Sequence, residues 1–227
     1  MDTGGRHFPK DVIVTAVRWY VAYPLSYRHV EELLCERGIE VDHTTVHRWV
    51  IRFSPLLLAQ ARRRQQKLGK SWRMDETYVC VRGRWCYLYR AVDRAGKTID
   101  FFLSPHRDEE SARRFLTRAM MLHGIPYRIS IDGYVGNRAA IETINAERAK
   151  IHLRAIPIRQ CAYLNNVLEQ DHRGIKRKLK LMMGFKSFVS ATATLCGIEL
   201  AHFLRKGQLR EKYSRLSLAQ QFAILAA

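Results

Sequence analysis

The 227-residue sequence has no apolar run that approaches the length of a membrane span, and its first residues, MDTGGRHFPKDV, lack the apolar core of a signal peptide. It also lacks the cysteine patterns of zinc sites and disulfide frameworks, because its five cysteines include no C-x-x-C pair and their number is odd. Internal repeats and low-complexity tracts are absent as well. These absences favour a cytoplasmic protein with reduced thiols and no membrane partner.

Acidic residues are scarce relative to basic ones. The 21 Asp and Glu residues stand against 39 Lys and Arg, which gives a net charge of +18. Phosphate contacts by Lys and Arg supply most of the non-specific affinity of proteins for nucleic acids, so this charge favours a nucleic-acid partner. A ribosomal protein, or one that is merely very soluble, is the alternative. The hydrophobic content of 47% allows a sizeable core, and the length fits one large domain plus a small one.

Residues 8–53 show helical periodicity in three segments. Pro9 stands at a helix start, Ser26 and Asp42 are suitable N-caps, and Gly38 ends the second segment. A helix, a glycine-containing turn and a second helix that opens with short polar residues form the pattern of a helix-turn-helix. A small helical unit with an ordinary solvated face is the alternative. The side chains predicted to contact DNA are Thr44, Thr45, His47, Arg48 and Arg52.

The pattern changes after a basic connector at 54–71, which is either a solvated helical linker or a DNA contact. From Trp72 the hydrophobic period alternates, as in strands, and helical segments then intervene. The order βββαβαβαα predicts an α/β fold, a mixed sheet flanked by helices whose first three strands form an antiparallel meander. The predicted strands cover 77–81, 85–92, 98–103, 128–131 and 151–156, and the predicted helices cover 108–123, 137–150, 165–181 and 190–206.

Three carboxylates stand where such a fold could hold metal ions. Asp75 begins the first strand of the meander, Asp132 ends the strand after the first crossover helix, and Glu169 lies one turn into a basic helix. The two strands can be neighbours in a mixed sheet, which would bring the aspartates together. Carboxylate oxygens suit Mg²⁺ or Mn²⁺, and two such ions can activate an attacking oxygen and stabilise the leaving one. Taken singly, Asp132 is more typical of a strand-to-turn position and Glu169 of a helix surface, whereas Asp75 could equally well be the solvated start of a strand.

Other carboxylates fit this site less well. Strand alternation should turn Glu76 to the sheet face opposite Asp75, and Asp93 falls in a turn. Asp171 lies about 200° around the helix from Glu169. Lys176, by contrast, follows Glu169 by seven residues and shares its helix face. The basic side chains of this helix that are predicted to contact DNA phosphates are Arg173, Lys176, Arg177, Lys178 and Lys180.

At these residues the chain resembles the IS6-family insertion-sequence transposases, the IS26-like group. The matching segments span about residues 5–208 and include MDETYVCVRGRWCYLYRAVDRAGKTIDFFLS, NNVLEQDHRGIKR and GFKSFVSATATLCGIELAHFLRKGQ. The resemblance implies an RNase H-like integrase catalytic core at 72–208, preceded by a helix-turn-helix DNA-binding domain at 1–53 and a basic linker at 54–71, and followed by a C-terminal tail at 209–227. It also implies that the DDE triad is Asp75, Asp132 and Glu169, with Lys176 as the basic catalytic residue.

The function implied by this resemblance is DNA transposition. Such an enzyme binds the terminal inverted repeats of its element, cleaves the ends by metal-dependent hydrolysis and joins the 3′-OH to target DNA by transesterification. The expected cofactor is a pair of Mg²⁺ ions, for which Mn²⁺ can substitute. The expected partners are double-stranded DNA and further copies of the chain, and the expected location is the bacterial cytoplasm, at the nucleoid. A transposase-derived DNA-binding protein without catalysis, and an RNase H-like nuclease or integrase of another type, are the alternatives.

The chain departs from the family pattern after the second aspartate. Where the family often has a Lys-Ala-Pro-Ala-Tyr-like run, this chain has Gly133-Tyr134-Val135-Gly136-Asn137. Leu164 also replaces the usual Arg before the Asn-Asn pair, and the spacing from Asp132 to Glu169 is slightly longer. We expect contacts with the transferred strand or the terminal base to differ at these positions.

Overall fold

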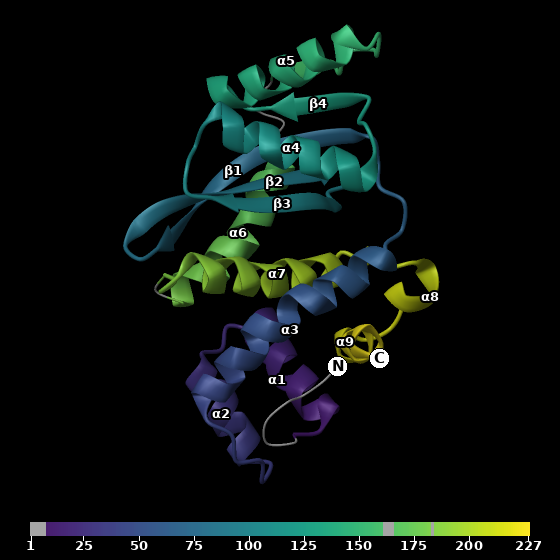
Figure 1. The fold of residues 1–227 in the computed structure, drawn as a ribbon. Helices are drawn as coiled ribbons and strands as arrows, with labels where there is room; N and C mark the ends of the chain where they lie inside the picture. The colour runs from purple at the N-terminus through teal and green to yellow at the C-terminus, as the bar shows by residue number, and fades with distance from the viewer. Residues whose placement is uncertain (1–7, 161–165, 183) are drawn as a thin grey trace. The chain divides into compact units, whose positions relative to one another are not determined.

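The computed structural model describes residues 8–160, 166–182 and 184–227, with only the backbone described at 166–171 and 181. It divides into two compact units (Figure 1). One unit combines residues 1–66 with residues 177–227, and the other is the continuous stretch 67–176. The first unit is therefore assembled from both ends of the chain. None of the described helices is long and apolar enough to cross a membrane.

The discontinuous unit opens with the three predicted helices, α1 (Lys10–Ala22), α2 (Tyr27–Cys35) and α3 (His43–Arg63). Their ends follow the predicted capping. The Ser26 hydroxyl accepts from the backbone N–H of His29 in a capping box, and the Asp42 carboxylate accepts from the backbone N–H groups of Thr44 and Thr45. Gly38 takes the left-handed conformation, with φ of 71°, directly after α2. This local chemistry fixes where each helix begins and ends.

Helix α3 is longer than predicted, because it continues through most of the stretch expected to be a connector. Phe53, Leu57 and Ala61 are buried at helical spacing and extend the apolar stripe of its first half. Pro55 removes one backbone hydrogen bond inside the helix without ending it. The segment from residue 54 to Arg63 is thus part of a packed helix and not a linker.

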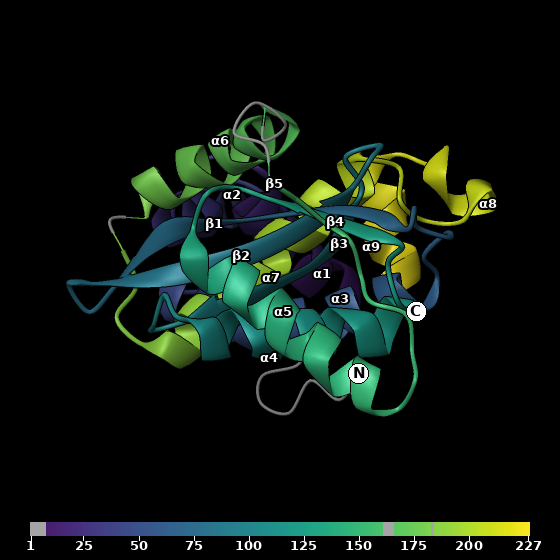
Figure 2. The same cartoon turned by 90° about the horizontal axis from the view of Figure 1, so that it is seen from above.

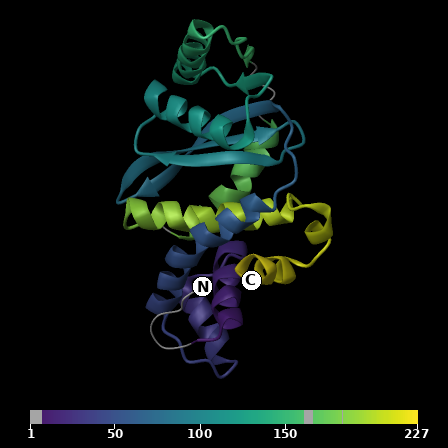
Figure 3. The ribbon, with the colours of Figure 1, turned by 45° about the vertical axis from the view of Figure 1, so that its right-hand side comes forward.

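Three helices from the C-terminal part of the chain complete this unit: α7 (Phe188–Arg205), α8 (Glu211–Ser214) and α9 (Leu218–Ala226). Figure 3 shows α9 beside α1 and α3. Phe222 and Leu225 of α9 are buried, so residues 209–227, expected as a tail, contribute to a core. The backbone N–H of Gln66 donates to the carbonyl of Gln208, which joins the segments that follow α3 and α7.

The continuous unit holds a five-stranded sheet in the order β3-β2-β1-β4-β5. Strands β1, β2 and β3 form the predicted antiparallel meander, and β1, β4 and β5 run parallel. Two predictions need correction. β1 begins six residues earlier than predicted, and the last strand follows residues 151–156 instead of covering them, because His152 turns the chain in the left-handed conformation with φ of 56°. The strands are β1 (Ser71–Val81), β2 (Arg84–Asp93), β3 (Thr98–Ser104), β4 (Arg128–Ile131) and β5 (Ile158–Gln160).

Helices α4 (Glu109–His123) and α5 (Val135–Lys150) cover one face of this sheet, next to each other, and the first part of α6 (Asn166–Leu181) lies on the opposite face (Figures 1 and 2). The core fills the space between the sheet and α4 and α5, and the α4 residues that face it are Ala112, Phe115, Leu116, Ala119 and Met120. The largest buried side chains of this core include Trp72, Met74, Tyr89, Phe115, Leu116, Ile129 and Ile131.

Candidate active site

Asp75 and Asp132 come from neighbouring parallel strands. Asp75 lies in the middle of β1, not at its beginning as predicted, whereas Asp132 directly follows the last residue of β4. The register pairs Arg73 of β1 with Ser130 of β4, so the next positions on the same side of the sheet are Asp75 in β1 and Asp132 just after β4. The sheet therefore brings the two aspartates together, as expected. The arrangement is held by the backbone, which makes it rigid.

This arrangement changes the pKa of Asp75. Burial, aided by the nearby carboxylates of Glu76 and Asp132, raises the pKa of its carboxyl to about 7, although a hydrogen bond from the backbone N–H of Glu76 and the charge of Arg107 oppose the shift. On the α6 side, His172 Nδ1 lies 4.0 Å from Asp75 Oδ2. Such a buried carboxylate beside a second one is the donor chemistry that a hard divalent cation stabilises.

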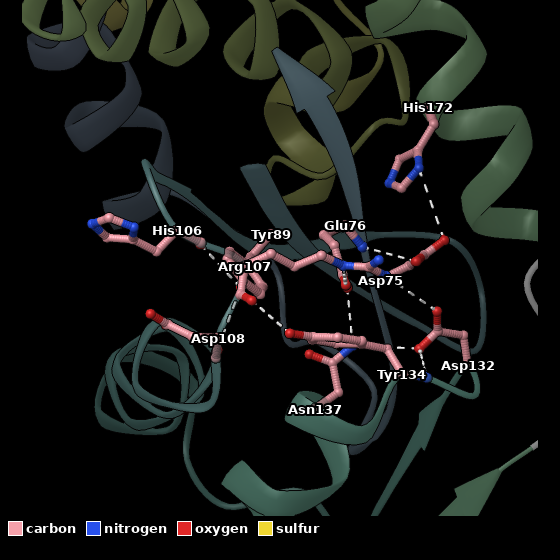
Figure 4. A network of polar contacts seen from close by, with 10 residues as sticks. All are labelled: Asp75, Glu76, Tyr89, His106, Arg107, Asp108, Asp132, Tyr134, Asn137 and His172. Atoms are coloured by element: carbon pink, nitrogen blue, oxygen red, sulfur yellow. Dashed lines mark hydrogen bonds and ion pairs between the residues drawn. The ribbon is translucent and has the colours of Figure 1, made fainter. Parts of the chain in front are cut away.

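Glu76 belongs to the same centre, although strand alternation sends it away from Asp75. Its side chain is only 2% exposed and accepts from Arg107 Nε at 2.5 Å. It also accepts from Asn137 Nδ2 at 2.9 Å, and the same amide nitrogen lies 3.4 Å from Asp132 Oδ1 (Figure 4). Alternation predicted its sheet face but not this connection, which the N-terminal end of α5 supplies.

The run that departs from the family pattern forms the rest of this network. The Tyr134 hydroxyl donates to the carbonyl of Arg107 at 2.5 Å, and the Arg107 guanidinium lies 4.0 Å from the centre of the Tyr134 ring. The backbone N–H of Tyr134 donates to Asp132 Oδ1 at 3.0 Å. A Cβ at Gly136 would lie 2.6 Å from the Tyr134 ring, so glycine is required there for the ring to fold back over the turn. Sequence reasoning singled out this run as unusual but assigned no role to Arg107, Tyr134 or Asn137.

The third expected carboxylate, Glu169, lies in the first turn of α6. Its side chain is outside the described part of the structure. Position 169 precedes His172 by one helical turn, so both positions share the side of α6 from which His172 approaches Asp75. Among the side chains that the structure describes, no group of three Asp, Glu, His or Cys residues could hold a metal ion. The triad as a whole stays a prediction.

Rival carboxylates are engaged elsewhere. Asp93 is the last residue of β2 and not part of the turn as predicted; it is buried and orders the turn that follows by accepting from the backbone N–H groups of Gly69, Ala95 and Lys97. Asp100 is fully buried and pairs with Arg118 at 2.7 Å. Asp171 lies outside the side chains that are described.

The residues predicted to contact DNA divide into accessible and buried ones. Arg48 and Arg52 are exposed on α3, and Arg173, Lys176, Arg177 and Lys180 are exposed on α6. His47 is half-buried and meets the Tyr27 ring edge-on, with centroids 5.2 Å apart. The hydroxyls of Thr44 and Thr45 both donate to the Asp42 carboxylate, so they serve the helix cap.

Lys178 requires a correction. Its side chain is buried, and its ammonium donates to the backbone carbonyls of Tyr23 and Leu25 and lies 4.6 Å from the centre of the Tyr20 ring. Burial lowers its pKa to about 8, with the neighbouring Arg205 charge acting in the same direction. An ammonium enclosed in this way attaches α6 to the loop after α1 and is not available to a phosphate.

Comparison with known proteins agrees with this architecture. A family model described as a DDE domain matches residues 69–208. The transposase for insertion sequence-like element IS431mec from Staphylococcus aureus is 40% identical over 209 residues, which cover 90% of this chain and 89% of that protein. The transposase for insertion sequence element IS257 in transposon Tn4003, also from Staphylococcus aureus, is 40% identical with the same coverage.

Solved structures show a weaker likeness. The HTLV-2 integrase catalytic core domain in complex with magnesium, in its trimeric form, is 15% identical with a TM-score of 0.42 and covers 60% of this chain and 86% of that one. The BIV integrase catalytic core domain is 17% identical with a TM-score of 0.44 and covers 58% and 82%. Neither likeness is needed for the assignment, which follows from the sheet order and the family match.

The sheet order, with an aspartate in β1 beside one that follows β4, defines an RNase H-like fold, as predicted. The chain belongs to the DDE-domain transposases. It is a DNA transposase, an enzyme of metal-dependent DNA cleavage and strand transfer.

Proposed function

We propose that the chain is a transposase of the IS6 family that acts on the terminal inverted repeats of its element. It hydrolyses the phosphodiester at each element end and leaves a 3′-OH. This hydroxyl then attacks a target phosphodiester, so that one phosphorus–oxygen bond forms as the target strand's own bond to that phosphorus breaks. The adjacency of Asp75 and Asp132 on β1 and β4 is the observation that carries this proposal.

The residues fit the divalent ions that this chemistry uses. Asp75 and Asp132 offer carboxylate oxygens side by side, and the raised pKa of Asp75 reflects a buried negative site without a sufficient counter-charge. Together with Glu169 they would hold two Mg²⁺ ions, with Mn²⁺ as a substitute. Bound there, the ions would neutralise charge on the scissile phosphate and lower the pKa of an attacking water. Lys176, exposed on α6, would bind a DNA phosphate beside the triad.

A strand-transfer assay with element-end DNA, target plasmid and Mg²⁺ tests this proposal. Asp75→Ala, Asp132→Ala and Glu169→Ala should each lower strand transfer by more than about a thousandfold, as expected when charge stabilisation of the transition state is lost. Glu142→Ala is the matched control, since this carboxylate is 57% exposed on α5 and forms an ion pair with Arg138 of the same helix. Wild-type-like joining by any triad variant would exclude that residue.

The second candidate is a DNA-binding protein that has lost catalysis, and the altered run at Gly133–Asn137 is the observation that keeps it open. It predicts binding to element ends with no cleavage in Mg²⁺ or Mn²⁺. The same assay therefore separates the two candidates, provided that end binding is measured in parallel by gel shift.

We assign recognition of the element ends to α2 and α3. Arg48 and Arg52 are exposed on α3, where they can reach bases or phosphates. We expect the chain to act as a homodimer or higher oligomer in the bacterial cytoplasm, at the nucleoid, because two element ends must be joined to one target. Footprinting on candidate ends tests the recognition, and Arg48→Ala should remove protection without lowering the unfolding temperature.

A further inference from the structure

Glu76 is a buried carboxylate, and the two side chains that donate to it, Arg107 and Asn137, also approach Asp132. Its side chain is 2% exposed, and Asn137, which donates to it, is fully buried. A buried carboxyl group is unfavourable unless it is paired and hydrogen-bonded, so its position depends on its partners. Arg107 and Asn137 supply that pairing.

The same two partners also face Asp132. Asn137 Nδ2 lies 3.4 Å from Asp132 Oδ1, and Arg107 Nη2 lies 3.9 Å from Asp132 Oδ2. Tyr134 adds its backbone N–H to Oδ1 at 3.0 Å and holds the backbone of Arg107 through its hydroxyl. Asp132 Oδ1 is thus approached by the Tyr134 backbone N–H and the Asn137 amide, and Oδ2 by the Arg107 guanidinium (Figure 4). Glu76 holds both Asn137 and Arg107 in place.

We propose that Glu76 is a positioning residue for Asp132, acting through Asn137 and Arg107, and that the run Gly133–Asn137 is the part of the chain adapted to it. The proposal rests on the proposed function of Asp132 as a metal ligand. Residues that orient a metal ligand without touching the metal commonly change metal affinity about 10–100-fold when they are replaced. In this chain the orienting role falls to an acid on the face of β1 that the triad does not use.

Manganese binding measured by electron paramagnetic resonance on the full-length protein, without DNA, tests this role. Glu76→Gln and Asn137→Ala should each weaken Mn²⁺ binding about tenfold, and their double variant should lose less than the product of the single losses, because they act through one path. Asn137→Ala alters no charge, so it separates orientation from the loss of a nearby negative group. Glu142→Gln, on the outer side of α5, is the control and should bind as wild type does.

The outcomes are distinct. Unchanged Mn²⁺ affinity in folded Asn137→Ala overturns the proposal even if Glu76→Gln binds more weakly, since charge alone would then explain the effect. If Asp75→Ala and Asp132→Ala also bind Mn²⁺ normally, the proposed metal site itself fails. Circular dichroism on each variant establishes that it is folded, and Glu76→Asp, which keeps the charge but shortens the side chain, should fall between wild type and Glu76→Gln.

A second observation concerns the β1–β2 hairpin, which extends past the ends of α4 and α5 (Figures 1 and 2). Tyr78 and Trp85 are 49% and 63% exposed. Their ring centroids lie 6.1 Å apart, and Tyr87 adds a third ring 5.3 Å from Tyr78. From Tyr78 to Arg90 the chain contains no acidic residue, and Arg82 and Arg84 occupy the exposed turn.

We infer that the exposed rings of Tyr78 and Trp85, supported by the half-buried ring of Tyr87, form a hairpin aromatic surface that stacks against unpaired bases of a DNA strand, while Arg82 and Arg84 face its phosphates. Exposed rings beside positive charge form the combination by which proteins bind single strands, because every base offers a face for stacking. Opening of DNA ends would present such a strand to the enzyme. The inference rests on DNA being the substrate, and not on the identity of the triad.

Fluorescence of a 2-aminopurine-labelled single strand measures this contact directly. Trp85→Ala should weaken single-strand binding about tenfold and abolish quenching of the label, while binding to a blunt duplex stays within about twofold. Tyr127→Ala removes a 58% exposed ring elsewhere in the same unit and is the matched control. Unchanged single-strand affinity overturns the inference, as does a change in sedimentation that shows the surface to join copies of the chain.

Discussion

His172 Nδ1 lies 4.0 Å from Asp75 Oδ2, so a buried imidazole of α6 faces the buried carboxyl of β1. This pair brings the helix that carries Glu169 to the strand that carries the first aspartate. The imidazole side chain is 5% exposed and the carboxyl 16%, so solvent screens their interaction only weakly. Burial accordingly raises the pKa of Asp75 well above its ordinary value.

The metal-free protein should lose stability as the pH rises from about 4 to about 7. Folding raises the pKa of Asp75 from 3.8 to about 7. Within that window the folded protein keeps a proton that the unfolded chain has released, so increasing pH favours the unfolded state. Thermal unfolding in EDTA at pH 5 and pH 8 measures this, and Asp75→Asn should flatten the difference. The expectation is wrong if the unfolding temperature falls equally between pH 5 and pH 8 in wild type and in Asp75→Asn.

Removal of the α3 cap should destabilise the helical unit. Asp42 accepts from the backbone and hydroxyl groups of Thr44 and Thr45, and these hydrogen bonds hold the pKa of its carboxyl well below the usual range. Asp42→Ala should therefore lower the unfolding temperature by about 2–4 °C. The stabilisation is present above pH 4 and disappears as the pH falls through the lowered pKa, so wild type and Asp42→Ala should converge in strong acid. Calorimetry across pH 2–7 would detect this.

Lys178 and Lys180 should behave differently although both belong to the basic helix. Lys180→Ala should reduce the salt dependence of DNA binding by about one unit of slope, because an exposed phosphate contact is lost. Lys178→Met should leave that slope unchanged and lower the unfolding temperature, because the carbonyls of Tyr23 and Leu25 lose their donor. Filter binding across a salt series distinguishes them. A reduced salt dependence of DNA binding in Lys178→Met would show that Lys178 does contact DNA.

Gly197 should tolerate no side chain. A Cβ at this position of α7 would lie 2.5 Å from Val21 Cγ1 and 2.6 Å from Ser54 Oγ, so α7 would have to move away from α1 and α3. We expect Gly197→Ala to destabilise the protein by about 1–3 kcal/mol, the usual cost of overpacking. Urea denaturation gives the value, and Thr192→Ala, on an exposed position of the same helix, should cost less than about 1 kcal/mol.

The sequence predicted the order of strands and helices along the chain and the antiparallel meander, because alternation of apolar residues marks the strands. It also predicted that Asp132 ends a short buried strand that could lie beside the strand of Asp75, whereas the spatial order of all five strands came from the structure. The ends of elements were less predictable. α3 runs through the expected linker because burial of Leu57 and Ala61 overrides the basic composition that follows.

The network around Glu76 was beyond sequence reasoning for a different reason. Arg107 and Asn137 are 30 residues apart and meet Glu76 only through the tertiary fold. No local pattern distinguishes a buried Asn that holds a carboxylate from one on a helix surface. Lys178 shows the converse, since a lysine within a basic run looks exposed until the packing of α6 against Tyr20 and Tyr23 is known.

Because the helical unit combines residues 1–66 with 177–227, it cannot finish folding until the end of the chain has been synthesised. Helices α1, α2 and α3 leave the ribosome first, but α7 and α9, which cover their apolar faces, are made last. Residues 67–176 are continuous in the chain, so they can fold while the last helices are still being translated, as domains generally do. A nascent chain thus acquires its sheet, with Asp75 and Asp132, before the helices that would hold DNA are complete. Premature termination within α7 would leave a chain with a folded sheet, including Asp75 and Asp132, and an incomplete helical unit.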